Sequence, residues 1–470
     1  MTRAEGHGGQ EVAGVSRIEG PLVVAEGVGS VGYDEMVEVV DHQGRVRRGR
    51  VLEAGAGVAV IEVFAGTTSL SIEDTEVRFV GRPMRLPVSA EMLGRVFDGL
   101  GDPIDGGPPS LAEDWADVNG QPINPIARTY PRDYIETGIS ALDGMNTLVL
   151  GQKLPVFSGS GLPHDQLAAQ LVRQARVPTI EEASESGQFA IVFAAMGVKH
   201  DVARFFRDSF IAGGALTRAT MFLNLADDPP IERLITPRAA MTLAEFLAFE
   251  RDMHVLVVLT NMTNYCEALR QISSVRGEVP SRKGYPGYLY SDLASIYERS
   301  GRIETSSGSV TLLPILTMPN DDITHPVPDL TGYITEGQIV LDRELFQQDV
   351  YPPVAILPSL SRLMKDGIGG ERTRADHANL AAQLYASYAH VQDVRALASV
   401  IGEEELTTVD QRHLEFGRAF EREFLTQEKD ERRTITETLD IGWRVLSLVP
   451  EEELTRVTEE EIRDHYQRRR

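Results

Sequence analysis

The segment from Leu154 to Asp165, LPVFSGSGLPHD, combines residue types that could bind a phosphate group. A short apolar run leads into a glycine-rich turn, and residues 166–173 then predict a helix. Strand, glycine-rich turn and helix form the phosphate-binding loop, in which backbone N–H groups and a lysine face the phosphate oxygens. This layout therefore suggests the binding of a nucleoside triphosphate.

The positions that carry out this chemistry hold other residues here. The pattern is glycine, four residues, glycine, lysine, and serine or threonine. Counted from position 158, Ser158 and Pro163 replace the glycines, His164 replaces the lysine, and Asp165 replaces the magnesium-binding hydroxyl. Pro163 lacks an N–H, His164 is short and mostly neutral near pH 7, and Asp165 adds a negative charge or caps the helix. We expect a remnant that binds nucleotide weakly or not at all, without a metal site. Its candidate residues are Ser158, Gly159, Ser160, Gly161, Pro163, His164 and Asp165.

The composition argues against several classes of protein. There are 46 basic and 70 acidic residues, a net charge of −24, whereas nucleic-acid binding needs basic patches. The single cysteine, Cys266, excludes an intrachain disulfide and a cysteine-based metal site. The apolar run 255–259 is far shorter than the roughly 20 residues of a membrane-spanning helix, and the N-terminus does not resemble a signal peptide. Any contact with a membrane is expected to be indirect.

Residue patterns divide the chain into four segments. Residues 1–13 are polar and glycine-rich and are predicted to be disordered. Residues 14–80 contain short β-type runs between turns, which indicate a small barrel or sandwich. In residues 81–354, apolar runs alternate with helical stretches, which predicts a mostly parallel sheet with helices on both faces, and the polar stretch 181–186 is expected to be a surface loop. Residues 355–470 have helical apolar stripes and predict a bundle. The central strand candidates are residues 155–157, 189–194, 220–224, 255–260 and 312–317.

Several long motifs resemble the B subunit of V/A-type rotary ATPases and ATP synthases. The resemblance covers about residue 14 to the C-terminus, and GQKLPVFSGSGLP is highly specific to that subunit. It implies an N-terminal β-barrel, a central RecA-like nucleotide-binding α/β domain and a C-terminal helical bundle. It also implies a stator ring of three A and three B subunits, in which A is catalytic and B is non-catalytic or regulatory. The matching segments are residues 94–109, 138–175, 254–273, 282–303, 325–339 and 357–369.

The resemblance further implies partners, location and ligands. The expected partners are the catalytic A subunit, the central rotor shaft and, through the N-terminal domain, the peripheral stalks. The chain would lie at the cytoplasmic face of a membrane as a peripheral subunit of an ion-translocating complex. ATP or ADP with Mg²⁺ would bind at the interface with the A subunit, so that the chain has no cofactor of its own. Alone it would not be an enzyme, whereas the complex would be.

Two further positions support a silent site. The apolar strand 255–259 leads into Thr260 and Asn261, where a working site needs a magnesium-holding aspartate. Catalytic relatives have Gly-Glu-Arg where this chain has Gly197, Val198 and Lys199, so that the water-activating glutamate is missing. Together with the lysine and the hydroxyl, four functional groups are absent from their expected places.

Arg362, in the sequence Ser-Leu-Ser-Arg, matches the family's arginine finger, which reaches the A subunit's site across the interface. A guanidinium group is planar and permanently charged, as phosphoryl oxygens require. The alternative is an arginine in a surface ion pair. Thr324 aligns with a position beside the same interface, where a functional and a structural role are about equally favoured. Ser359 and Ser361 also belong to this interface segment, where we expect them to shape the loop rather than contact nucleotide.

Three hypotheses remain. The first is a non-catalytic subunit that completes the A subunit's site through Arg362. The second is an autonomous RecA-type ATPase that uses the loop at 158–165, against which the missing lysine, aspartate and glutamate count. The third is a purely structural ring spacer, against which Arg362 and its motif count.

Overall fold

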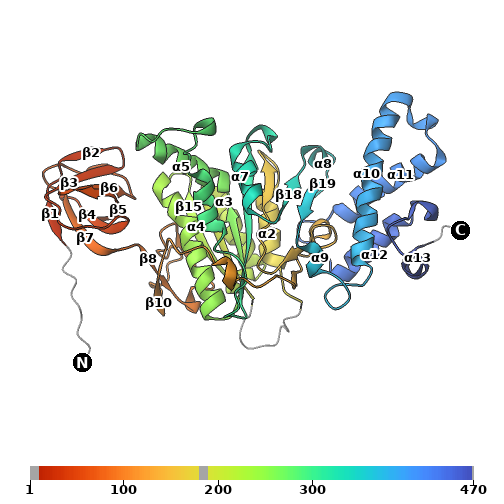
Figure 1. The fold of residues 1–470 in the computed structure, drawn as a ribbon, viewed down its shortest axis with the longest axis horizontal. Coiled ribbons are helices and arrows are strands. Elements are labelled where there is room, and N and C mark those ends of the chain that lie inside the picture. The colour runs from red at the N-terminus through yellow and green to blue at the C-terminus, as the bar shows by residue number, and fades with distance from the viewer. Residues whose placement is uncertain (1–9, 179–188, 468–470) are drawn as a thin grey trace.

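Three structural regions follow one another along the chain and along the long axis of the molecule (Figure 1). The computed structural model describes residues 10–178 and 189–467. The predicted disorder of residues 1–9 and the predicted loop at 181–186 lie outside the described residues. Within the described part, no helix is both long and apolar enough to cross a lipid bilayer.

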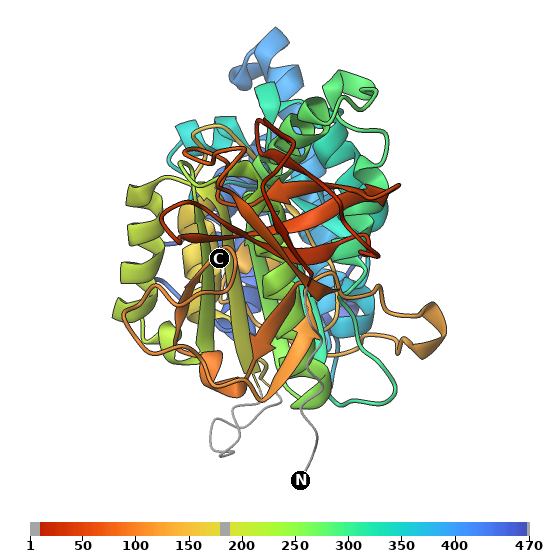
Figure 2. The same ribbon diagram turned by 90° about the vertical axis from the view of Figure 1, so that its left-hand side faces the viewer.

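The N-terminal region is a seven-stranded antiparallel sheet with the order β1-β7-β4-β5-β6-β3-β2. Its two edge strands, β1 and β2, are consecutive in the chain and joined only by residues 14–16, so the sheet edges approach each other and the sheet curls into a barrel (Figure 2). The strands are β1 (Glu11–Ala13), β2 (Arg17–Glu19), β3 (Leu22–Glu26), β4 (Glu35–Val40), β5 (Val46–Gly55), β6 (Val58–Val63) and β7 (Glu76–Pro83).

One prediction for this region was wrong. Residues 11–13, assigned from the sequence to a disordered tail, form β1 and pair with Glu76–Arg78 of β7. Strand β7 supplies the backbone hydrogen-bond partners of these residues. The local sequence, which is polar and rich in glycine, gives no sign of this pairing. The barrel therefore begins before residue 14.

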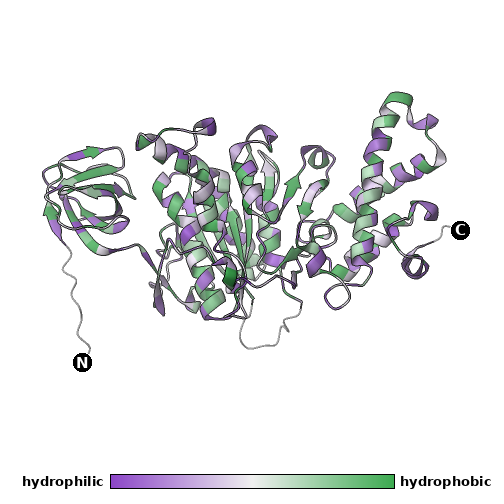
Figure 3. Ribbon diagram, in the orientation of Figure 1, coloured by the Kyte–Doolittle hydropathy of each residue, from purple (hydrophilic) through white to green (hydrophobic). Residues whose placement is uncertain are grey.

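The central region contains an eight-stranded sheet with the order β19-β18-β13-β17-β16-β14-β15-β9. All neighbours are parallel except β18 and β19, which confirms the predicted mostly parallel sheet. Most strand residues are buried, and Figure 3 shows the middle of the sheet as predominantly hydrophobic. The strands are β9 (Val96–Asp98), β13 (Val156–Gly159), β14 (Phe189–Val198), β15 (Ala219–Leu225), β16 (His254–Thr260), β17 (Ser309–Met318), β18 (Gly337–Leu341) and β19 (Val354–Ser361).

Helices cover both faces of this sheet because alternate strand residues point to opposite sides. Ile191 and Phe193 pack in the cluster that contains α2 and α3, whereas Ala190 and Val192 pack in the cluster that contains α4 and α5. The helices are α2 (His164–Gln174), α3 (His200–Ala212), α4 (Pro230–Glu245), α5 (Met262–Val275), α6 (Leu289–Tyr297), α7 (Pro326–Ile334) and α8 (Arg343–Gln347). Shorter elements are β8 (Arg85–Val88), β10 (Asp114–Asp117), β11 (Tyr134–Ile135), α1 (Ser140–Asp143), β12 (Leu148–Val149) and α9 (Met364–Gly367).

The C-terminal region is helical, as its apolar stripes predict. Phe420 lies between Phe416 and Phe424, with ring centroids 5.6 and 4.9 Å apart. The helices are α10 (His377–Ile401), α11 (Thr408–Ala419), α12 (Ile435–Leu446) and α13 (Glu459–His465). The predicted boundary at residue 355 was wrong, because β19 pairs with β18 in the central sheet up to Ser361.

Candidate functional site

The predicted phosphate-loop remnant connects β13 with α2 at the carboxyl edge of the parallel strands. The turn is closed by hydrogen bonds from the Leu162 N–H to the Gly159 carbonyl (3.1 Å) and from the His164 N–H to the Leu162 carbonyl (2.9 Å). Helix α2 begins at His164, and Pro163 precedes it without a side-chain cap. Asp165 lies inside the first turn, so the suggestion that it caps the helix was wrong. The strand-turn-helix layout itself is confirmed.

The histidine at the lysine position is engaged within its own loop. Its Nδ1 lies 3.0 Å from the Leu162 carbonyl oxygen and 3.2 Å from the Ser158 hydroxyl. Its Nε2 lies 3.6 Å from the carboxylate of Asp165, whose pKa is raised by burial. A lysine at this position would instead carry an extended, permanently charged group toward phosphate.

An ion pair that the sequence analysis missed covers the loop. Arg343 forms a bidentate pair with Asp321 at 2.8 and 2.9 Å and also donates to the Ser160 carbonyl at 2.9 Å. A Cβ atom on Gly159 would lie 2.1 Å from an Asp321 oxygen, so the carboxylate packs directly on the strand end. Hydrogen bonding to Arg343 lowers the pKa of Asp321, which keeps it negative.

The positions of the missing magnesium-binding aspartate and water-activating glutamate hold Asn261 and Val198, which make contacts within the fold. The Asn261 side chain caps α5 by accepting from the Thr263 N–H at 2.9 Å, and it donates to the Thr317 hydroxyl at 3.1 Å. Val198 is a buried residue at the end of β14. Among the described residues, no group of three or more histidine, cysteine, aspartate or glutamate side chains is arranged to hold a metal ion.

Arg362 lies at the amino ends of the parallel strands, opposite to the carboxyl edge at which the loop lies. Strand β19 runs antiparallel to β18, with Val354 opposite Leu341 and Ser361 opposite Gly337. At about 3.3 Å per residue, the eight residues of β19 place its two ends about 23 Å apart. Arg362 is exposed, and its guanidinium forms no hydrogen bond or ion pair with residues 10–178 or 189–467. It cannot reach the chain's own loop.

The two serines of this segment are used inside the fold. The Ser359 hydroxyl donates to the Ala355 carbonyl at 2.5 Å and accepts from the Val340 N–H at 2.9 Å, where the β18–β19 register shifts. The Ser361 hydroxyl donates to the Thr147 carbonyl at 2.8 Å. Each residue is only 6% exposed, and both lie in β19 rather than in the loop that the sequence suggested.

Thr324 does not lie beside Arg362. It is in the loop between β17 and α7, at the carboxyl edge, where its hydroxyl donates to Asp322 at 2.6 Å and its carbonyl accepts from Arg282 at 3.1 Å. Hydrogen bonding from Thr324 and Lys283 lowers the pKa of Asp322 to about 2. The two residues lie at opposite ends of the strands, and their expected place at one interface with the A subunit stays a prediction.

Further cations line a cavity formed in part by the segment that follows Arg362. Arg132 and Lys365 line a cavity of about 400 Å³ together with Tyr130, Asp366, Ile368 and Arg372. Like Arg362, the side chains of Arg132 and Lys365 are exposed and unpaired within the described part of the chain. In a chain with a net charge of −24, a local group of unpaired cations is suited to an anionic partner.

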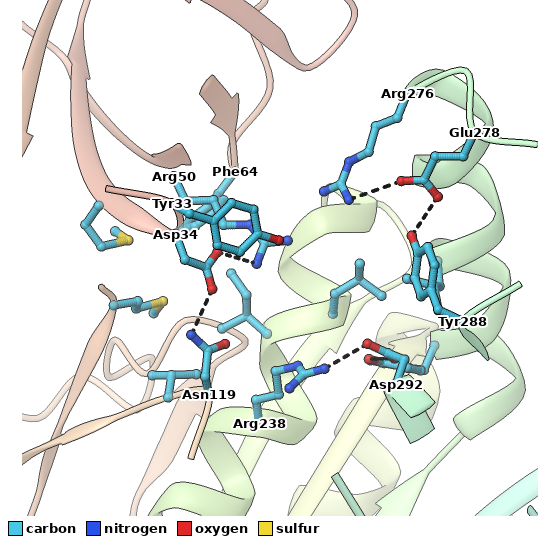
Figure 4. A pocket seen from close by; sticks show the side chains of 17 residues that line it. Tyr33, Asp34, Arg50, Phe64, Asn119, Arg238, Arg276, Glu278, Tyr288 and Asp292 are labelled. Carbon is cyan, nitrogen blue, oxygen red and sulfur yellow. Dashed lines mark hydrogen bonds and ion pairs between the residues drawn. The ribbon is translucent and has the colours of Figure 1, made fainter. Parts of the chain in front are cut away.

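A cavity of about 390 Å³ lies between the barrel and the central region (Figure 4). Each of its arginines is already paired: Arg50 with Asp34 at 3.2 Å, Arg238 with Asp292 at 2.9 Å, and Arg276 with the buried Glu62 of the barrel at 2.9 Å. All three guanidinium groups are thus bound by carboxylates of the chain itself. We therefore interpret this cavity as part of the ion-paired contact between the barrel and the central region, not as a ligand site.

The side chain of Glu232, near β9, lies close to three aspartate side chains. Glu232, in the first turn of α4, has its pKa raised to about 7 by burial and by the charges of Asp228, Asp98 and Asp102, while Arg48 acts in the opposite direction. Burial likewise raises the pKa of Asp98. The folded state therefore holds the Glu232 proton more tightly than the unfolded chain, in which the pKa is near 4.5. This contribution to stability is complete below pH 4.5 and is lost as the pH rises through 7.

We expect Glu232→Gln to raise the free energy of unfolding at pH 8 by about 1 to 3 kcal/mol, and by less at pH 5, because glutamine carries no charge. Urea unfolding of the wild type and the variant at both pH values measures the difference. Glu404→Gln, at an exposed position, serves as the control. A gain that is the same at both pH values would contradict the prediction.

Comparisons with known proteins agree with this architecture. Residues 15–81 match the beta-barrel domain of the ATP synthase alpha/beta family, and residues 138–361 match its nucleotide-binding domain. Residues 366–466 match the C-terminal domain of V and A type ATP synthase.

Individual relatives cover almost the whole chain. The V-type ATP synthase beta chain of Halothermothrix orenii is 60% identical over 457 residues, which are 97% of this chain and 98% of that protein. The B subunit of the A-type ATP synthase of Aeropyrum pernix is 60% identical over 459 residues, 98% of each chain. A solved structure of the ATP synthase subunit NeqB from Nanoarcheaum equitans is 40% identical, covers 91% of this chain and 98% of that chain, and has a TM-score of 0.72. The resemblance seen in the motifs is confirmed, and the chain belongs to the family of B subunits, or beta chains, of V/A-type ATP synthases.

Proposed function

We propose that this chain is a non-catalytic, regulatory B subunit that completes the catalytic site of a neighbouring A subunit with Arg362. The observation that carries the proposal is the exposed, unpaired guanidinium of Arg362 at the sheet edge remote from the chain's own loop, within the described residues. Such a group is available to an anion on another subunit.

The chemistry of guanidinium suits this role. It offers planar, permanently charged donors to phosphoryl oxygens whose charge grows as the bond to the leaving group breaks. Nucleotide and Mg²⁺ would be held by the A subunit, because the loop of this chain lacks the lysine and hydroxyl and has Asp321 packed on Gly159. The part of this chain is to place one positive charge, without holding nucleotide or metal.

The same proposal covers the assembly. Three copies alternate with three A subunits in a stator ring around the central rotor shaft, and the N-terminal barrel contacts the peripheral stalks. The complex translocates ions across a membrane that this chain meets only through its partners, at the cytoplasmic face. Support comes from the B-subunit relatives.

The alternatives are less well supported. An autonomous ATPase would need groups that this loop lacks, and His164 and Asn261 are committed to contacts within the fold. A purely structural spacer would not need an unpaired Arg362.

Turnover of the isolated chain and of the A–B complex with Arg362→Ala tests the proposal. We expect an inert isolated chain and an assembled variant complex with strongly reduced turnover. Hydrolysis by the isolated chain would overturn the silent-site argument. Normal turnover of the assembled variant complex would make Arg362 structural.

A further inference from the structure

Lys153 and Gln152 lie beneath the end of β19, beside the segment that carries Arg362. We propose that Lys153 is a positioning residue that keeps Arg362 unpaired by binding the carboxylate of Glu336, which would otherwise capture it. This inference rests on the proposed function of Arg362 and names a residue on which that function depends.

The strand register brings Glu336 to Arg362. Gly337 of β18 lies opposite Ser361 of β19, so the next residue outward on each strand, Glu336 and Arg362, is the next opposed pair. A hydrogen bond from the Arg362 N–H to the Glu336 carbonyl, at 3.0 Å, continues the ladder. Directly opposed residues of antiparallel strands point to the same face, with Cβ atoms roughly 4.5 to 5.5 Å apart. Opposite charges at such positions attract each other.

Nevertheless the carboxylate of Glu336 is bound elsewhere. One oxygen lies 2.7 Å from the Lys153 ammonium, and the other accepts from the Lys153 backbone N–H at 2.8 Å. The Lys153 side chain is only 4% exposed, so its charge is held among its partners. The second of them, Glu298, lies 3.4 Å from the ammonium and is also bound by Arg128 at 2.8 Å. Both carboxylates are therefore neutralised without Arg362.

Gln152 fixes the backbone on both sides of Arg362. Its amide donates to the Glu336 carbonyl at 3.1 Å and to the Ser361 hydroxyl at 2.9 Å, and the residue is fully buried. The backbone that carries Arg362 is thus held in place, while Lys153 removes the nearest competing charge. Loss of the Lys153 charge would leave a free carboxylate opposite Arg362, and the two would pair within the chain.

The test is a mutant cycle in the reconstituted A–B complex, measured as ATP hydrolysis. Lys153→Met keeps the buried apolar stem and removes the charge, and we expect kcat to fall about five- to ten-fold with little change in the KM for ATP, since only the supply of free Arg362 changes. Glu336→Gln alone should leave kcat near the wild-type value, because an uncharged glutamine side chain does not attract Arg362. Adding Glu336→Gln to Lys153→Met should restore kcat.

Two further variants separate positioning from folding. In an Arg362→Ala background, Lys153→Met should cause no further loss, because no finger remains to be captured. Lys153→Arg should retain turnover, because the charge is kept. Should Lys153→Met fail to assemble, Lys153→Gln enters the same cycle.

An unchanged kcat in the Lys153 variant, or a loss that Glu336→Gln does not restore, would overturn the inference. The proposed function would survive either result as long as Arg362→Ala abolishes turnover. If Arg362→Ala leaves turnover unchanged, the proposed function falls first, and that result is independent of Lys153.

Discussion

Turnover of the reconstituted A–B complex is expected to fall by about a thousand-fold or more when Arg362 is replaced by alanine. The guanidinium would stabilise charge that develops on the phosphoryl oxygens in the transition state, so the loss should appear in kcat, with a smaller effect on KM. Because the Arg362 guanidinium forms no hydrogen bond or ion pair with the described residues of its own chain, its truncation should leave folding and assembly unchanged.

Matched variants make the result specific. Arg362→Lys keeps the charge but loses the planar, forked donors, so it should restore only a small part of the activity. Arg132→Ala removes an exposed cation of the cavity that Lys365 also lines, and it too is unpaired in the part of the chain that the structure describes. Its turnover should stay near that of the wild type. An equal loss in Arg132→Ala would assign the effect to the general charge of this surface and contradict the finger. The ATPase assay is made on rings whose subunit ratio has been checked by size-exclusion chromatography.

The largest expected effect on stability comes from Arg299→Met. Arg299 has a side chain that is 0% exposed and forms a bidentate pair with Glu245 at 2.8 and 2.5 Å. It also donates to the Val118 carbonyl at 3.0 Å and to the Thr242 hydroxyl at 2.8 Å. Its removal leaves the partly buried Glu245 carboxylate without its bidentate partner and breaks the buried bonds to Val118 and Thr242, which should lower the free energy of unfolding by about 3 to 5 kcal/mol.

A surface ion pair provides the control for this prediction. Arg418 pairs with Glu403 at 2.7 Å, with both side chains about 60% exposed, so Arg418→Met should change stability by less than about 1 kcal/mol. Urea unfolding of the isolated chain, followed by circular dichroism, compares the midpoints and slopes of the transitions. Equal midpoints for the wild type and Arg299→Met would show that the buried network adds no net stability.

Local residue patterns determined most of the architecture. The central strands were predicted because buried parallel strands are short, continuous apolar runs, as in Val255–Leu259. The C-terminal helices were predicted because Phe416, Phe420 and Phe424 recur at helical spacing. Motif resemblance predicted the family, and the relatives confirm it. The strand and helix signals each lie within a few neighbouring residues.

Other features depend on contacts between residues far apart in the sequence, which local patterns do not show. Strand β1 depends on β7, and β19 depends on β18, so each was assigned from the sequence to the wrong segment. Arg343, at the start of α8, and Asp321, in the turn after β17, come together over Gly159, and neither has a local signal of that contact.

The edge of the sheet at which each site residue lies is likewise a property of topology. The motif around Arg362 identified the residue, but only the antiparallel turn of β19 places it away from the loop and from Thr324. The same register sets Glu336 opposite Arg362 and leaves its carboxylate to Lys153. Residue types thus determined which chemistry the chain retains, because chemistry belongs to side chains. Only the tertiary structure decided which charged side chains form ion pairs, because such a pair requires segments far apart in the sequence to lie at the same edge of a sheet.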